Sequence, residues 1–209
     1  MAVEQQKQEH PAYLQPYARA VRRHGPDFRA LLWASRQTQE TRFEAMLQLA
    51  DPTGRAVLDL GCGCADLLDF LLAHGFAPSR YVGLEGVDEL ADAAESKGHA
   101  IAQIVRADFV REPGRIAAAK ADIVFCSGAF NTIDTVDFYA AIANAFAAAR
   151  RSLVFNFLGS PLLAGMSYLR WRDPRDVLRF ARSLTPSVQR RDDYLEGDCT
   201  IAMGKAWHA

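Results

Sequence analysis

The sequence predicts an α/β fold built on one mostly parallel sheet of seven strands that closes with an antiparallel hairpin. Two observations predict it. From Arg55 onward, short apolar or β-branched runs alternate with helical patterns, which is typical of repeated βαβ units. Near the end, two more such runs flank Glu196-Gly197-Asp198, a turn signal between hairpin strands. We therefore expect a parallel sheet with an antiparallel edge.

Each predicted strand is short and rich in apolar residues. The strands are expected at residues 56–60, 81–85, 101–107, 122–127 and 152–157, with the hairpin at 188–195 and 200–205. Apolar residues at three- and four-residue spacing predict helices between the strands. These helices are expected at 65–73, 87–96, 115–120 and 136–149, and a further one opens at Asp173-Pro174 and runs to about Ser183.

Before the first strand, residues 11–49 are predicted to form two or three helices with a break at Gly25-Pro26. We expect this segment to cover the carboxyl edge of the sheet. Half of the 209 residues are apolar, which suits one sizeable core and is too little for two ordinary domains. We therefore expect one domain over 1–209, with 1–50 as a helical lid and 51–209 as the core.

Charge and hydropathy exclude several classes of protein. Lysine plus arginine (24) nearly cancels aspartate plus glutamate (25), so no overall field favours nucleic acid or a membrane surface. Residues 1–10 are polar, and the longest apolar run, 140–149, falls short of the roughly 20 residues that a membrane helix needs. We expect a soluble, cytoplasmic protein. The cysteines lack paired C-x-x-C spacing, so no metal site is expected, and Cys126 and Cys199 are predicted to be small buried strand residues.

The most informative stretch is 57–66, VLDLGCGCAD, an apolar strand that ends in a glycine turn and leads into a helix. Glycines let a ligand approach the backbone where a Cβ would collide. A dinucleotide-binding turn would carry a third glycine at position 66, where this chain has Asp66, whose carboxylate would repel a pyrophosphate. Together with the terminal hairpin, this argues against a nicotinamide oxidoreductase.

The pattern Asp59-x-Gly61-x-Gly63-x-Ala65 resembles motif I of the class I, S-adenosylmethionine-dependent methyltransferases, with Ala65 in place of the usual third glycine. The resemblance implies a Rossmann-like sheet, S-adenosyl-L-methionine as cofactor and S-adenosyl-L-homocysteine as product. It places Asp59, Gly61, Cys62 and Gly63 beside the cofactor. An alanine at position 65 tightens the turn but still allows a cofactor.

More cofactor contacts are expected at the ends of the next two strands. Glu85 follows the glycine turn by about 20 residues, where an acidic side chain can accept both hydroxyl hydrogens of a ribose. The resemblance gives it this role, with Gly86 next to it; the alternative is an exposed strand-end carboxylate. By the same resemblance, Asp108 faces the adenine amino group and Phe109 lies beside the adenine ring.

The loop after the fourth strand, Ser127-Gly128-Ala129-Phe130-Asn131, is where we expect methyl transfer, because open α/β sheets bind ligands at the carboxyl ends of their strands. Ser127 and Gly128 are predicted cofactor contacts, and Ser127 and Asn131 are the candidates nearest the acceptor. For Asn156 in the fifth strand we favour a buried amide that satisfies backbone groups. No catalytic base is assigned, since none of the five histidines lies in a motif.

At the level of the whole chain, the sequence is similar to a group of bacterial class I methyltransferases of unassigned substrate. The marks are Trp33-x-Ser35-x-x-x-Gln39-x-x-Arg42-Phe43, the 127–131 loop, Phe155-Asn156-Phe157 and Asp193-Tyr194-Leu195. Trp33, Gln39 and Arg42 are expected to form a lid in which Arg42 binds the methionine carboxylate bidentately. The alternative is that Trp33 anchors the core and Arg42 forms a surface ion pair.

A small molecule is the favoured methyl acceptor, because the net charge is near zero and no nucleic-acid module is appended. DNA is not expected, since the 127–131 loop lacks the Asp/Asn-Pro-Pro-aromatic run of enzymes that methylate base amino groups. An RNA or protein acceptor, and a protein that binds the cofactor without turnover, are alternatives that the sequence leaves open. The aromatic segment 162–171 is either a cover for the substrate pocket or a packed excursion. The sequence does not assign an oligomeric state.

Overall fold

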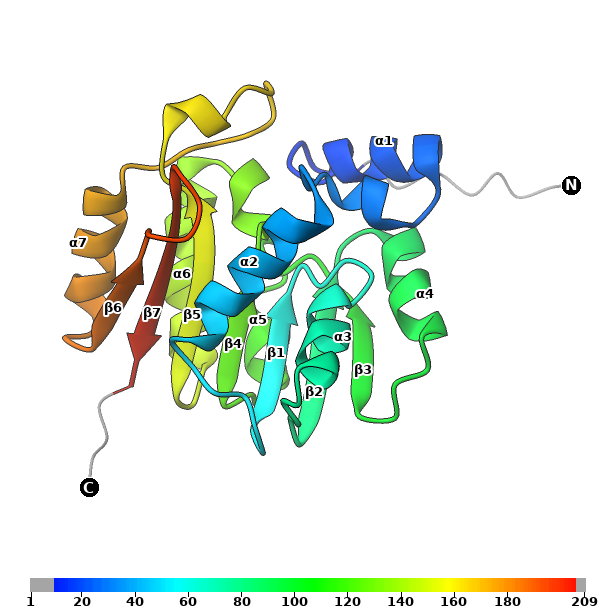
Figure 1. The fold of residues 1–209 in the computed structure, drawn as a ribbon, viewed down its shortest axis with the longest axis horizontal. Coiled ribbons are helices and arrows are strands. Elements are labelled where there is room, and N and C mark those ends of the chain that lie inside the picture. Colours follow the sequence, from blue (N-terminus) through cyan, green and yellow to red (C-terminus); the bar gives the residue numbers. More distant parts are fainter. Residues whose placement is uncertain (1–9, 206–209) are drawn as a thin grey trace, which may run out of the picture.

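In the computed structural model, which describes residues 10–205, seven strands form one sheet in the order β3-β2-β1-β4-β5-β7-β6 (Figure 1). The strands are β1 (Ala56–Leu60), β2 (Arg80–Glu85), β3 (Ala102–Arg106), β4 (Ile123–Cys126), β5 (Ser152–Leu158), β6 (Val188–Arg191) and β7 (Asp198–Gly204). The first five pair in parallel, whereas β7 is antiparallel to both β5 and β6. The predicted fold class is confirmed.

Helices connect the strands, and several begin at a side chain that accepts a backbone hydrogen bond. The helices are α1 (Gln15–His24), η1 (Phe28–Leu31), α2 (Arg36–Leu47), α3 (Asp66–Ala73), α4 (Asp88–Ser96), α5 (Gly114–Ala118), η2 (Ala129–Thr132), α6 (Thr135–Ala148), η3 (Pro161–Leu163) and α7 (Pro174–Leu184). Ser35, Asp134 and Asp173 cap α2, α6 and α7, because each side chain accepts an otherwise unpaired N–H of the first turn. None of the helices within residues 10–205 is long and apolar enough to span a membrane.

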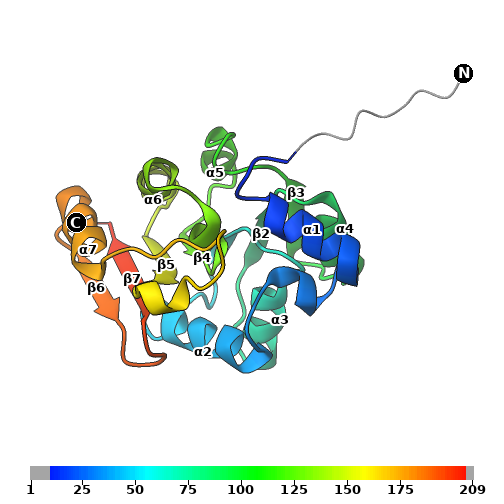
Figure 2. The ribbon, with the colours of Figure 1, turned by 90° about the horizontal axis from the view of Figure 1, so that it is seen from above.

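Two apolar cores lie on the two faces of the sheet, since successive strand residues point to opposite sides. Leu58 belongs to the core beneath α5, α6 and α7, whereas its neighbour Val57 packs with α2, α3 and α4 on the other face. Seen from above, α5 and α6 lie on one side of the sheet and α2 and α3 on the other (Figure 2). Helices therefore cover both faces, and ligand access is left to the strand ends.

An aromatic cluster anchors the loop that follows β4. Phe130 in η2 is fully buried, and its ring centroid lies 5.4 Å from that of Phe138 and 5.6 Å from that of Phe155, both edge-on. Edge-to-face pairs of this kind add to the stability that burial already provides. The loop that carries the predicted acceptor residues is therefore held by the core beneath it.

The N-terminal segment divides into two parts, which corrects the prediction that all of it covers the carboxyl edge. Helices α1 and η1 lie above that edge (Figure 1). Helix α2 instead packs on one face of the sheet, with Phe43 and Met46 buried in the same core as α3. These two residues are three apart on a helix and share one face, so their burial draws α2 into the core.

The first strand of the hairpin is shorter than predicted, because β6 ends at Arg191. After it the chain turns back, and the Tyr194 hydroxyl donates a 2.7 Å hydrogen bond to Asp198 at the start of β7. The predicted run to residue 195 is therefore wrong at its end: Tyr194 contributes to the turn through its side chain.

Candidate cofactor and acceptor site

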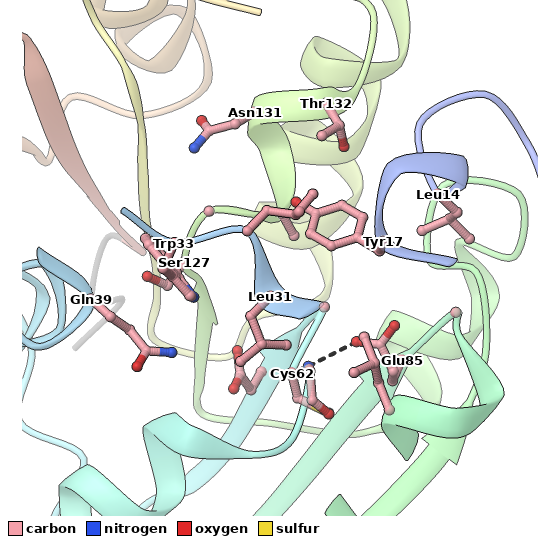
Figure 3. Close-up of a pocket in the computed structure, with 18 of the residues that line it drawn as sticks. Leu14, Tyr17, Leu31, Trp33, Gln39, Cys62, Glu85, Ser127, Asn131 and Thr132 are labelled. Atoms are coloured by element: carbon pink, nitrogen blue, oxygen red, sulfur yellow. Dashed lines mark hydrogen bonds between the residues drawn. The ribbon is translucent and has the colours of Figure 1, made fainter. Parts of the chain in front are cut away.

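A pocket lies at the carboxyl edge of the sheet, beneath the N-terminal helices (Figure 3). Its wall includes every site residue predicted from the sequence: Trp33, Gln39, Arg42, Asp59, Gly61, Cys62, Gly63, Glu85, Gly86, Asp108, Phe109, Ser127, Gly128 and Asn131. These residues come from five segments that are far apart along the chain, and the parallel topology brings them together. What each contributes to a bound ligand stays a prediction.

The glycine turn between β1 and α3 requires left-handed backbone. Gly61 and Gly63 have φ of 70° and 55°, and a Cβ on Gly61 would lie 2.5 Å from the Cβ of Ala129. Ala65 also adopts this conformation, with φ of 59°, and its side chain is fully buried. A left-handed alanine costs about 1 kcal/mol relative to glycine. The alanine therefore keeps the backbone shape of the motif.

The Glu85 carboxylate joins the glycine turn to the end of β2. Its two oxygens accept hydrogen bonds from the backbone N–H of Gly63 at 2.8 Å and of Val87 at 2.9 Å, and Figure 3 draws the first of these as a dashed line. Burial raises the pKa of Glu85, and the backbone hydrogen bonds oppose that rise. Glu85 is 5% exposed, so the alternative of an exposed strand-end carboxylate is wrong. Each oxygen retains a lone pair that can accept a hydroxyl hydrogen from a ligand.

Asp59 is a second buried carboxyl group, at the end of β1. The Tyr81 hydroxyl donates to it at 2.6 Å, and Asp59 is 3% exposed. Burial raises its pKa to about 7, although the hydrogen bond from Tyr81 acts in the opposite direction. Asp59 is therefore partly protonated near neutral pH.

The lid residue Gln39 is buried on α2, where its amide nitrogen donates to Asp66 at 3.1 Å. Lys97 also binds Asp66, at 2.9 Å. Asp66 opens α3, where a carboxylate is favoured by the helix dipole. Asp66, whose carboxylate is unfavourable for binding a dinucleotide, thus connects α2 to α3 beside the glycine turn.

Arg42 forms an ion pair, as in the second of its two predicted roles, but the pair is buried and not at the surface. Its Nε donates to Oδ2 of Asp198 at 2.6 Å, and one terminal nitrogen contacts the same oxygen. Only 11% of the Arg42 side chain and 1% of the Asp198 side chain are exposed. The guanidinium carbon also lies 4.9 Å from the centre of the Trp33 ring. The pair therefore fixes α2 against β7 and supports Trp33.

Three lid side chains rest on three strand-end glycines. A Cβ on Gly86 would lie 2.7 Å from Leu14, and one on Gly128 would lie 2.8 Å from Trp33. A Cβ on Gly63 would lie 2.6 Å from the Leu31 side chain. Glycine at these sites lets the lid approach the strand ends closely. Sequence reasoning missed Leu14 and Leu31, since isolated leucines on an N-terminal helix carry no motif.

The predicted adenine contact, Asp108, already accepts hydrogen bonds within the chain. The Tyr13 hydroxyl donates to its Oδ2 at 2.6 Å, and the Val110 N–H donates to its Oδ1 at 3.0 Å. Desolvation, together with the negative charge of Asp108, raises the pKa of Tyr13. Tyr13, which the sequence reasoning also missed, therefore ties the lid to the end of β3.

The loop after β4 is organised by Asn156. This side chain is fully buried, accepts from the Gly128 N–H at 2.9 Å and donates to the Ser127 hydroxyl at 3.0 Å. The predicted buried amide is confirmed. Asn131 accepts from the Leu158 N–H at 3.2 Å through its side-chain oxygen. Its amide nitrogen has no hydrogen-bond partner within residues 10–205 and remains available to a ligand at the pocket wall.

The strand order β3-β2-β1-β4-β5-β7-β6, with β7 antiparallel, is a fold that this chain shares with solved methyltransferase structures. Residues 57–152 match the model of a family described as a methyltransferase domain. Residues 57–152 therefore carry a methyltransferase domain, a class of enzyme whose methyl donor is S-adenosyl-L-methionine. The family, enzyme class and cofactor predicted from the sequence are confirmed.

Solved structures share the fold at low sequence identity. Magnesium protoporphyrin IX methyltransferase (ChlM) from Synechocystis PCC 6803 with bound SAH is 14% identical, with a TM-score of 0.63 over 92% of this chain and 94% of that one. The DhpI-SAM-HEP complex is 13% identical, with a TM-score of 0.67 over 93% and 99%. The pyocyanin biosynthetic protein PhzM is 20% identical, with a TM-score of 0.65 over 91% and 62%. No curated protein sequence matches the chain.

Asp59→Asn tests the buried carboxyl group at the end of β1. Folded wild type holds the Asp59 proton more tightly than the unfolded chain, because the pKa is about 7 instead of 3.8. Its free energy of unfolding should therefore fall as the pH rises from about 4 to about 7. Between these pH values, urea denaturation should show the stability of D59N rising by about 2–4 kcal/mol relative to wild type. A difference that does not vary with pH would refute the shifted pKa.

Arg42→Ala tests the buried ion pair, because it leaves Asp198 buried without its cation. Breaking one partner of such a pair costs about 3–5 kcal/mol, which chemical denaturation would measure. The double variant Arg42→Ala/Asp198→Ala should lose less than the sum of its single variants. As a matched control, Arg29→Ala removes an exposed pair with Asp27 and should leave the midpoint nearly unchanged.

Proposed function

We propose that this protein binds S-adenosyl-L-methionine along the ends of β1, β2 and β3 and transfers its methyl group to a small molecule beside the loop after β4. The observation that carries the proposal is the buried Glu85 carboxylate next to the glycine turn. A buried carboxylate with unused lone pairs is suited to the two hydroxyl groups of a ribose.

The remaining groups on this side fit the other parts of the cofactor. Asp108 at the end of β3 can accept from the adenine amino group, and Phe109 offers an apolar ring that is nearly buried. Gly61 and Gly63 line the pocket, where the methionine portion can lie against the backbone of the turn. Arg42 retains a terminal nitrogen that no hydrogen bond within residues 10–205 uses, and this nitrogen can donate to the methionine carboxylate.

When bound, the cofactor supplies a methyl group that its sulfonium has already activated. The task of the protein is then to position the acceptor and to exclude water. Holding two reactants in line can contribute about 7–11 kcal/mol towards the barrier. Leu14, Leu31 and Trp33 close the pocket from above, where they contact the strand-end glycines. The lid therefore supports catalysis by enclosing the reactants.

The shape of the pocket favours a small acceptor. It is bounded above by α1 and η1 and at one side by Leu163 and Leu169 of the segment after β5. The similar structures include a magnesium protoporphyrin IX methyltransferase, which by its name acts on a small molecule. The near-neutral charge of the chain also offers little attraction to a polyanion such as RNA. A small-molecule acceptor is therefore the better-supported alternative.

Glu85→Ala tests cofactor binding by isothermal titration with S-adenosylmethionine, S-adenosylhomocysteine and NADH. Wild type should bind the first two and not NADH. The variant should bind S-adenosylmethionine at least about tenfold more weakly, because hydrogen bonds to a charged group are each worth about 1.5–3 kcal/mol. Glu95→Ala removes an exposed carboxylate of α4 that pairs with Arg106, and should leave the affinity unchanged.

Circular dichroism on both variants should confirm a folded chain before the titrations are compared. A preference for NADH, or equal losses of affinity in the Glu85 and Glu95 variants, would contradict the proposed cofactor site.

A further inference from the structure

We propose that the methyl acceptor is an uncharged molecule with an apolar body and a hydroxyl group, bound between the ends of β4 and β5, and that Tyr17 holds its hydroxyl oxygen. This inference rests on the proposed function, because it names the substrate class of the same pocket. It follows from the distribution of charge along the pocket wall and from two hydrogen-bond donors that face it.

The pocket has a charged half and an apolar half. Four acidic lining residues lie at the ends of β1, β2 and β3 or at the start of α3: Asp59, Asp66, Glu85 and Asp108. The opposite half, at the ends of β4 and β5, is lined mainly by Ala129, Ile133, Leu158, Leu163 and Leu169. The strand order β3-β2-β1-β4-β5 separates the two halves, because β4 and β5 lie on the far side of β1 from β2.

The close-up shows this separation (Figure 3). Asn131 and Thr132 lie on one side of the pocket, Cys62 and Glu85 lie on the opposite side, and the Tyr17 ring is placed between them. Tyr17 comes from α1, so it reaches the pocket from the lid. A cofactor that follows the carboxylates would leave the apolar half for the acceptor.

The charge of Arg42 does not make the apolar half attractive to an ion. Arg42 is the one basic residue of the described lining; Asp198 pairs with it at 2.6 Å, and the proposed function assigns its remaining nitrogen to the methionine carboxylate. An ionic acceptor would lose its hydration on binding against leucine and isoleucine side chains. Because this wall offers no free opposite charge, the desolvation penalty would not be compensated. The wall therefore selects an uncharged body.

Two polar groups in this half can donate hydrogen bonds. Tyr17 lines the pocket beside Thr132, and burial raises the pKa of Tyr17, so its hydroxyl stays protonated at neutral pH and has a hydrogen to donate. The Asn131 oxygen is occupied by the Leu158 N–H, so its free group is the amide N–H. A ligand bound beside these two donors therefore needs an atom whose lone pairs can accept a hydrogen bond.

A hydroxyl oxygen meets both requirements, since one lone pair attacks the methyl carbon while another accepts a hydrogen bond. In the step, the oxygen forms a bond to the methyl carbon, the bond from that carbon to sulfur breaks, and its electron pair goes to sulfur. The hydroxyl proton leaves to solvent at the pocket mouth. Donation from Tyr17 favours the ionised form of the hydroxyl and thereby aids its attack.

The apolar half is held in shape before any ligand binds. The segment that carries Leu163 and Leu169 is attached at its end, where the Arg170 N–H donates to the Asn131 carbonyl at 2.7 Å and the Arg172 N–H donates to the Leu158 carbonyl at 2.8 Å. The buried Arg172 guanidinium also lies 4.6 Å from the centre of the Phe138 ring. These bonds give the pocket wall a fixed position.

Titration of the 209-residue chain, saturated with S-adenosylhomocysteine, tests the substrate class. The probes are 4-ethylphenol, 4-hydroxyphenylacetate and tyramine, which share a para-substituted phenol and differ in charge. We expect 4-ethylphenol to bind at least about tenfold more tightly than either charged probe. Equal affinities, tighter binding of a charged probe, or no binding of 4-ethylphenol would overturn this inference alone. Failure of S-adenosylhomocysteine to bind would overturn the proposed function as well.

Variants locate the binding to the apolar half. Leu169→Glu should reverse the preference towards tyramine, because it places a carboxylate in the wall. Leu162→Glu adds the same charge to the same segment at a side chain that is 86% exposed, and should leave the order of affinities unchanged. A reversal in both variants, or in neither, would contradict the assigned position.

Tyr17→Phe tests the hydrogen bond to the acceptor. We expect the rate of labelled-methyl transfer to 4-ethylphenol to fall about tenfold or more, with the dissociation constant of S-adenosylhomocysteine unchanged. Tyr139→Phe is the matched control, since Tyr139 packs on Phe180 away from the pocket. Unchanged transfer in the Tyr17 variant would refute its role, as would an equal loss in both variants.

Discussion

The hydrogen bond from the Gly63 N–H to the Glu85 carboxylate is the interaction on which the site depends. It joins the ends of β1 and β2, which are parallel neighbours with Asp59 opposite Gly83. The absence of a side chain at Gly83 leaves room for Cys62, whose sulfur would lie 2.5 Å from a Cβ there. Because the carboxylate is buried, the bond acts in a medium of low dielectric and holds the glycine turn in one conformation.

Glycines at the carboxyl edge make room for side chains of the lid. Gly63, Gly86 and Gly128 belong to three different strand-end loops, and each accommodates a side chain from the N-terminal segment. The lid is further tied down through the Tyr13 hydroxyl and through α2, which is part of the core. The cover of the pocket and the sheet beneath it therefore form one packed unit, in which the position of the lid depends on the strand ends.

Most of the fold could be predicted from the sequence because its signals are local. Alternation of apolar strands and amphipathic helices, with capping residues such as Asp134 and Asp173, placed the strands and helices to within a few residues. The predictions were wrong where a contact between residues far apart in the sequence determines the position or the end of an element. Helix α2 leaves the carboxyl edge because Phe43 and Met46 enter the core, and β6 ends early because Tyr194 turns towards Asp198. Neither contact has a signature in the local sequence.

The sequence by itself determined the α/β class, the glycine turn and the acidic residues at the strand ends, because each depends on residue type at short spacing. Only the tertiary structure decided which residues pair with one another and which side chains reach the pocket. Arg42 and Asp198 are 156 positions apart, and no local pattern indicates that they pair. The same holds for Tyr17, which reaches the pocket only because α1 lies over the ends of the strands. Pairings across such separations follow from packing, in which shape and burial of the whole chain select the partners.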